Sequence, residues 1–180
     1  MAATTTARIE RATLTPFGAA AIAVVVGSDH HPGAIQHVEA WGDGAEWLLG
    51  TVASLCARSP EHRSSTGPLS GRHAALDGAL RRFGHLHLPA SRTPYHELLP
   101  AILGQRITAA QALAQWARLC ERYGEPAPGP LGLRLPPSAA RLLRVPAWEF
   151  HRLGIEEQRA RTLRVAARHA AYIDRTREME

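Results

Sequence analysis

Apolar and polar positions alternate, or gather in short β-branched runs, over the first 41 residues. Three stretches follow this pattern, at residues 8–14, 20–26 and 35–41. Turn-forming sequences separate them, at residues 15–18 and 28–33. The pattern predicts a small antiparallel β meander. After the break at 42–44, a helix with one apolar face is expected, formed by Trp47, Leu48, Val52, Leu55 and Cys56.

A polar segment rich in serine, proline and glycine divides the chain. It covers residues 58–71 and favours a boundary between two parts. The sequence therefore predicts a β-rich N-terminal domain at 1–58, a linker at 59–71 and a helical domain at 72–180. A short helix over 72–83 is expected to open the helical domain, followed by an extended connector at 85–89.

Helix start and stop signals follow one another through the second half. Thr93 and Pro94 are expected to begin a helix that ends at Gly104, with a kink at Pro100. A connector follows, and Thr108 with Gln111 forms a capping box for the next helix, which ends at Gly124. The predicted apolar stripe of that helix is Ala109, Leu113, Trp116, Cys120 and Tyr123.

Beyond a loop at 125–137 that holds five prolines, two short helices are expected, from Ser138 and over 146–153. A last helix is predicted from Glu156 or Glu157 to about Ile173, since acidic residues favour a helix N-terminus. Its predicted inward residues are Ala160, Leu163, Ala166, Ala167, Ala170 and Ile173. The fold class is thus α+β, a meander plus helix followed by an all-α part.

The composition is that of a soluble globular protein. Of 180 residues, 45% are hydrophobic and 21% charged. No apolar run reaches the roughly 20 residues of a membrane span, and no signal peptide precedes the first strand. The chain has no lysine. This excludes a Walker A phosphate loop and any Schiff-base chemistry on a lysine of this chain.

The positive charge is unevenly distributed. Residues 1–90 contain seven arginines and seven acidic residues, whereas residues 91–180 contain fourteen arginines and nine acidic residues. The entire net charge of +5 therefore lies in the second half, which favours a polyanionic partner there.

Metal and thiol chemistry are not expected. The pairs His30 with His31 and His85 with His87 have no third ligand nearby. Cys56 and Cys120 fall on predicted apolar helix faces and are expected to be buried core thiols, free in a reducing cytoplasm. No metal and no other cofactor is predicted.

One ordered series of motifs stands above this background. Ala101-Ile-Leu-Gly-Gln-Arg-Ile-Thr108 closes one helix and opens the next, and Leu135-Pro-Pro-Ser138, Val145-Pro-Ala-Trp148 and Arg159-Ala-Arg-Thr-Leu163 follow. In this series the chain resembles the AlkA-type 3-methyladenine DNA glycosylases of the helix–hairpin–helix superfamily, over nearly its whole length. The resemblance implies a DNA base-excision-repair protein. The family reaction hydrolyses the N-glycosidic bond of an alkylated purine without nicking the strand.

The family's hairpin of the type LPGxGxWTA and its catalytic aspartate have no counterpart in the 180 residues. Asp174 lies before the place where the hairpin would begin. The resemblance therefore implies a helical domain that stops before its chemistry, with no catalytic residue in this chain. Excision of alkylated bases by these residues alone is not expected.

The resemblance also implies roles in binding double-stranded DNA. Such enzymes flip a damaged nucleotide out of the duplex and fill the gap with a side chain. Arg106 occupies the position of that wedge, Gln105 would lie at the pocket mouth, and Thr108 follows in the same connector. The alternative is that these are solvated connector residues.

Arg161, Arg164 and Arg168 share a face of the last helix, extended by Tyr172 and Arg175. They either track phosphates or form an ordinary solvated face. Trp116, Trp148 and Phe150 are expected in the core rather than stacked on bases.

Two other functions remain open: a non-enzymatic DNA-binding or protein-interaction domain, and a helical interaction module without a nucleic-acid role. Self-association through uncovered apolar helix faces is expected, as is a cytoplasmic, nucleoid-associated location without membrane contact.

Overall fold

The structure is a computed structural model that describes residues 7–27, 34–56, 73–83 and 89–178. The chain divides into two compact units. One combines Met1–Gly50 with Thr93–Glu180, and the other is Thr51–Arg92. The predicted linker at 59–71 lies outside the described residues, so the domain division drawn from the sequence stays a prediction.

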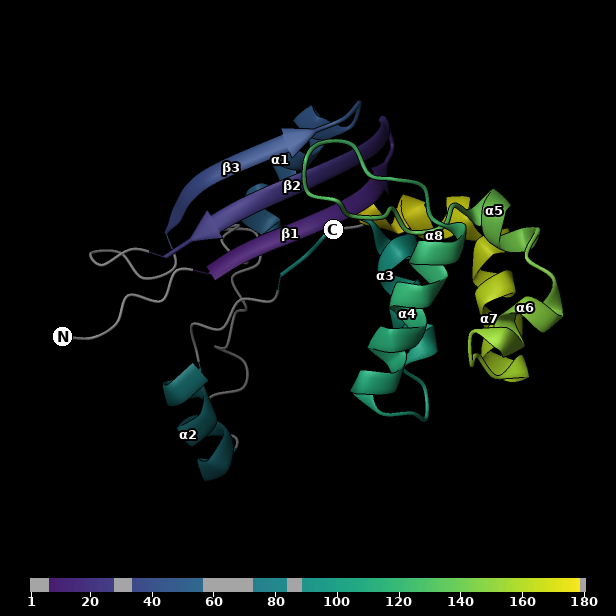
Figure 1. The fold of residues 1–180 in the computed structure, drawn as a ribbon. Coiled ribbons are helices and arrows are strands. Elements are labelled where there is room, and N and C mark those ends of the chain that lie inside the picture. The colour runs from purple at the N-terminus through teal and green to yellow at the C-terminus, as the bar shows by residue number, and fades with distance from the viewer. Residues whose placement is uncertain (1–6, 28–33, 57–72, 84–88, 179–180) are drawn as a thin grey trace. The chain divides into compact units, whose positions relative to one another are not determined.

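A three-stranded antiparallel sheet forms the N-terminal part, as the meander pattern predicted (Figure 1). Strands β1 (Ala7–Thr15), β2 (Gly18–Val26) and β3 (Ile35–Trp41) follow one another in space as they do in sequence. β2 lies in the middle, and its residues 20–24 are all buried. Burial on both faces explains why this strand is a continuous apolar run, whereas β1 and β3 carry polar residues.

A tight turn at Pro16 and Phe17 sets the register of the first two strands, in which Thr15 pairs with Gly18. The Thr15 hydroxyl accepts a hydrogen bond from the Phe17 amide at 3.1 Å and donates one to the Gly18 carbonyl at 2.9 Å. Gly18 has φ of +123°, which side chains rarely adopt. The second predicted turn, at 28–33, lies outside the described residues.

Eight α-helices are present among the described residues. They are α1 (Ala45–Leu55), α2 (Ala74–Phe83), α3 (Pro94–Leu103), α4 (Ala109–Tyr123), α5 (Ala139–Leu143), α6 (Ala147–Arg152), α7 (Glu157–Arg168) and α8 (Ala170–Arg175), followed by the 3₁₀ turn Thr176–Glu178. Helix α2 belongs to the smaller unit, and α1 spans the boundary between the two units. None of the described helices is long and apolar enough to cross a bilayer.

The single last helix predicted to reach Ile173 is wrong, because it is broken at His169. That residue has φ of −103° and ψ of 12°, and its amide bonds to the carbonyls of Val165 and Ala166. This shared bonding ends α7 and lets α8 start in a new direction.

The core of the helical part lies between α3, α4, α5, α6 and α7. Its largest fully buried side chain is Phe150, which was predicted to lie in the core. The inward stripe of α7 is also confirmed, because Ala160, Leu163, Ala166 and Ala167 all lie in this core. The structure thus gives no support for self-association through α7, since its apolar stripe is covered by this chain's own helices.

The predicted stripe of α4 is wrong in part. Leu113 is 67% exposed, and the buried residues of α4 are Gln115, Leu119 and Cys120. The face of α4 that is buried therefore differs from the predicted one. It includes Gln115, which bonds to a buried arginine described below. Trp148, expected in the core, is 59% exposed, and Trp116 is half-buried.

Neither cysteine forms a disulfide within the described residues, and the two differ in burial. Cys120 is buried as predicted, and burial raises the pKa of its thiol to about 12. Cys56 is only half-buried, so its prediction as a core thiol is wrong.

Polar contacts join β1 to α3 inside the larger unit. Arg11 donates to the Thr93 hydroxyl at 2.8 Å and forms an ion pair with Glu97 at 2.6 Å. Thr13, fully buried, shares a hydrogen bond of 2.9 Å with Nδ1 of His96. Thr93 therefore stands at the predicted N-terminus of α3 but does not cap it, because its hydroxyl faces Arg11. The helix then runs through Pro100 to Leu103.

The His96 contact predicts acid sensitivity. Burial lowers the pKa of His96 from 6.5 to about 4, so the folded protein keeps the ring neutral while the unfolded chain protonates it. The contribution of the neutral His96 ring to the free energy of unfolding is then fully present above about pH 6.5. It is lost as the pH falls from 6.5 toward 4, by at most about 3 kcal/mol.

Urea unfolding between pH 7.5 and 4 measures this loss. The variant His96→Gln should lose distinctly less stability across the same window, since glutamine does not titrate. Identical pH profiles for the two proteins would contradict the assignment.

Candidate nucleic-acid interface

The connector between α3 and α4 presents two of the predicted residues to solvent. Gln105 and Arg106 are both exposed, as is Thr108 one residue before α4. Arg106 has φ of +60°, a left-handed conformation that costs a non-glycine residue about 1 kcal/mol or more. A strained arginine therefore stands at the tip of a helix–turn–helix connector.

Thr108 has a local role that the sequence predicted. Its side chain accepts from the Gln111 amide, and Gln111 accepts in return from the Thr108 amide at 3.1 Å. This capping box satisfies backbone donors that the first turn of α4 leaves open. Thr108 thus closes the connector on the α4 side.

A buried arginine holds the connector on the α3 side. Arg159 of α7 is only 6% exposed, and its Nη1 donates to the Leu103 carbonyl at 3.0 Å and to Oε1 of Gln115 at 2.9 Å. Gln115 in turn donates through Nε2 to the carbonyl of Gly154, in the turn between α6 and α7. This Arg159–Gln115 network ties α3, α4 and α7 together next to the connector.

The hydrogen bonding of the Arg159–Gln115 network is incomplete. Nε of Arg159 has no hydrogen-bond partner among the described residues, and the Glu156 carboxylate lies 3.8 Å away. A buried guanidinium makes the removal of any of its acceptors costly. The C-terminal end of α3, three residues before Arg106, is therefore anchored to α7.

The three predicted arginines of α7 lie elsewhere. Arg161 is exposed and forms an ion pair with Glu157 at 2.9 Å, Arg164 is half-buried and donates to the Val145 carbonyl at 3.4 Å, and Arg168 is exposed. No hydrogen bond or ion pair within the described part of the chain joins them to the connector. The predicted site residues thus form two groups.

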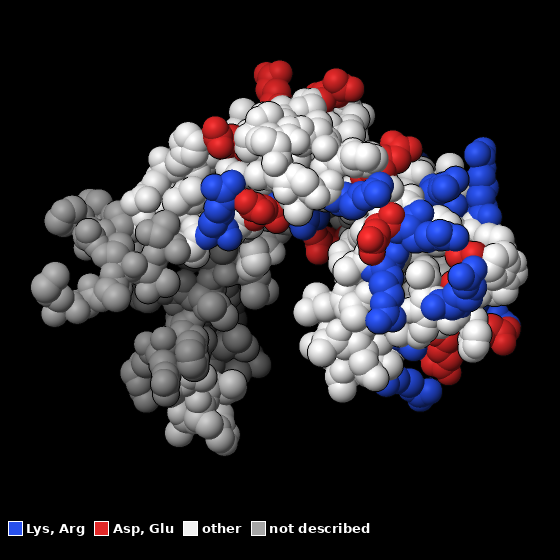
Figure 2. Space-filling model, viewed as in Figure 1, with Lys and Arg blue, Asp and Glu red and all other residues white. Residues whose placement is uncertain are grey.

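Arginines gather over the helical side of the face shown in Figure 2, where α4 to α7 lie in Figure 1, with several carboxylates interspersed among them. Several carry aromatic partners: Arg141 lies over the Tyr123 ring and Arg152 over the Trp148 ring, each at 5.7 Å from the centroid. This distribution agrees with the excess of arginine in the second half.

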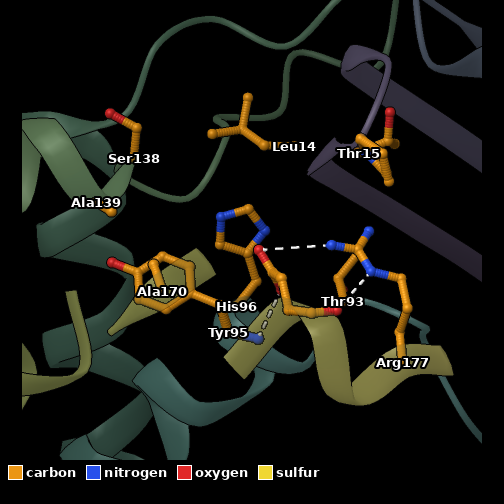
Figure 3. A pocket seen from close by; sticks show the side chains of 11 residues that line it. Leu14, Thr15, Thr93, Tyr95, His96, Ser138, Ala139, Ala170 and Arg177 are labelled. Carbon is orange, nitrogen blue, oxygen red and sulfur yellow. Dashed lines mark hydrogen bonds and ion pairs between the residues drawn. The ribbon is translucent and has the colours of Figure 1, made fainter. Parts of the chain in front are cut away.

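Asp174 lines a separate, small cavity between the β1–β2 turn and the helices. Figure 3 shows this cavity, with Tyr95, His96 and Arg177 among its lining residues. Its carboxylate accepts from the Tyr95 amide at 3.2 Å and lies 3.8 Å from Arg177. These partners give Asp174 a role in joining α8 to the start of α3. Burial and the Asp174 charge also raise the pKa of Tyr95, so its hydroxyl stays protonated.

The described residues contain no group of three histidine, cysteine, aspartate or glutamate side chains that could hold a metal. The pairs at 30–31 and 85–87 lie outside those residues.

Comparison with known proteins gives one kind of match. No protein-family model and no curated protein sequence matches the chain. Among solved structures, the fold is similar to that of 3-methyladenine DNA glycosylase from Archaeoglobus fulgidus, with a TM-score of 0.65 and 17% sequence identity. The match covers 89% of this chain and 55% of that one, so the chain spans about half the length of the solved protein. It shows a glycosylase-like fold.

Two features of the site escaped the sequence. The sequence assigned Arg159 and Gln115 no buried role, and long polar side chains are seldom buried. The spacing of Gln115 did offer a signal. It lies four residues before Leu119, on the same face of α4, whereas Leu113 lies on the opposite face. The exposure of Trp148 had no signal, since an aromatic residue beside an apolar helix is most often core.

Replacing Arg159 and its neighbour Arg161 separates the buried network from the surface. Arg159→Ala leaves the Leu103 carbonyl and Oε1 of Gln115 without their Arg159 donor, and we expect the free energy of unfolding to fall by about 2–4 kcal/mol. Arg161→Ala, two residues along the same helix, breaks only an exposed pair and should change it by less than about 0.5 kcal/mol. Chemical denaturation measures both, and equal losses would show that Arg159 carries no special weight.

Proposed function

We propose that this protein binds duplex DNA through the α3–α4 connector and belongs functionally to base-excision repair of alkylated bases. The observation that carries the proposal is Arg106, exposed and left-handed at the tip of the connector. Backbone strain persists where the surrounding structure imposes it and gathers at functional positions. The fold's likeness to a 3-methyladenine DNA glycosylase supports the same assignment.

In this proposal Arg106 enters the duplex where a nucleotide has left the base stack. A guanidinium plane stacks on neighbouring bases and also pairs with phosphates, which a purely apolar wedge does not do. Gln105, beside it, offers both a donor and an acceptor to a base edge. Arginines of the helical half add salt-dependent attraction to the backbone.

Substitutions at Arg106 test this role in two directions. Arg106→Ala keeps the left-handed strain and removes the guanidinium, so binding to a duplex with an abasic site should weaken about tenfold, with a salt slope smaller by about one. Arg106→Gly should weaken binding equally while raising the free energy of unfolding by about 0.5–1 kcal/mol, because glycine relieves the strain.

Fluorescence anisotropy at several salt concentrations, with denaturation in parallel, provides the two readouts. Arg8→Ala on β1 is the matched control, since it removes one exposed arginine from the sheet. The connector would lose its role if Arg106→Ala bound the abasic duplex like the wild type, or if Arg8→Ala weakened binding as much.

The proposal separates binding from excision. Glycosidic cleavage needs a carboxylate free to stabilise positive charge on the sugar, and Asp174 is engaged with Tyr95 and Arg177. We expect these 180 residues to bind DNA and to release no 3-methyladenine from alkylated duplex above a no-protein control. Chromatography of the released bases measures this, and any release that scales with protein concentration would refute it.

A further inference from the structure

A second surface, formed by α6 and α7, carries chemistry that the connector does not use. A cavity of about 430 Å³ lies there, in the range of small-molecule sites, about 300–1,000 Å³. Its walls are apolar, formed by Ala147, Phe150, Ile155 and Ala160. We call this surface the α6–α7 groove.

Trp148 lines the groove and is 59% exposed. It is the most exposed of the four tryptophans among the described residues, the other three being half-buried. Arg152 lies over the ring at 5.7 Å from its centroid, which orients the indole without burying it. An exposed, oriented aromatic face beside an apolar cavity is a platform for stacking a planar ring.

The charge around the platform is positive. Arg161 and Arg164 line the groove, against the single lining carboxylate of Glu157. Arg161 forms an ion pair with that carboxylate at 2.9 Å, and Arg164 donates a hydrogen bond from one nitrogen to the Val145 carbonyl. Each guanidinium has five N–H donors, so both keep donors for an anion.

We propose that the α6–α7 groove binds an unpaired nucleotide of a single DNA strand, with its base stacked on Trp148 and its phosphate on Arg161 and Arg164. Apolar walls, one aromatic face and a basic rim together match the chemistry of single-strand sites, where stacking and backbone charge act side by side. An apolar protein segment would instead offer no acceptor to the remaining N–H donors of the two guanidinium groups. This inference rests on the proposed DNA-binding function and adds a site to it.

The test uses the full chain and three probes: a ten-residue oligothymidylate, an abasic deoxyribose-phosphate strand of the same length, and thymidine monophosphate. Oligothymidylate should bind about tenfold more tightly than the abasic strand and quench tryptophan emission. Trp148→Ala should remove that tenfold preference and the quenching. Arg164→Ala should weaken both strands and reduce the salt slope by about one.

Phe17→Ala is the matched control, since Phe17 is an aromatic residue of the β1–β2 turn that is 67% exposed and does not line the groove. It should bind all probes like the wild type. Equal affinity of wild-type protein for thymidylate and abasic strands would overturn the proposal. So would Trp148-dependent binding of a hydrophobic dye without any effect on the oligonucleotides, which would indicate an apolar partner.

The binding at the α6–α7 groove can be distinguished from the binding at the α3–α4 connector. Arg106→Ala should leave single-strand binding unchanged, and Trp148→Ala should leave the abasic-duplex preference unchanged. Binding of thymidine monophosphate as tight as that of the strand would assign the groove to free nucleotides and overturn the single-strand proposal.

Discussion

A buried guanidinium organises the helical half of this protein. Arg159 is surrounded by core side chains, and the Leu103 carbonyl and Gln115 are the acceptors of its hydrogen bonds. A buried charge that loses a hydrogen-bond partner is costly, so a shift of the helices that carry these two acceptors is unfavourable. The end of α3, the middle of α4 and the start of α7 are thereby held in one arrangement, and Gly154 joins it through Gln115.

That constraint bears directly on the exposed connector. Leu103 immediately precedes the segment in which Arg106 adopts its left-handed conformation, and the capping box at Thr108 closes the other side. A five-residue connector fixed at both ends has few conformations left. The strain at Arg106 is therefore balanced by burial and hydrogen bonding elsewhere, which is how a rigid scaffold presents one side chain in a defined orientation.

Local sequence patterns predicted the strands, turns and helix ends more accurately than they predicted which helix faces are buried. The three strands, the turn at Pro16 and the capping box follow from patterns within a few residues, and all are confirmed. The orientation of α4 does not follow from such local patterns, because the partner that Gln115 bonds to in the interior, Arg159, is 44 residues away in the sequence. The break at His169 and the exposure of Trp148 depend in the same way on what packs against each helix. The two groups of candidate site residues could be named from sequence, whereas their separation required the fold.

The central claim is that the connector held by Arg159 is where the protein meets DNA, and backbone NMR tests it most directly. Titration of the isotope-labelled chain with a duplex containing an abasic site should shift the amides of 104–108 most strongly. The amides of β2 should remain unmoved. Shifts centred on the sheet, with the connector unaffected at saturation, would contradict the account.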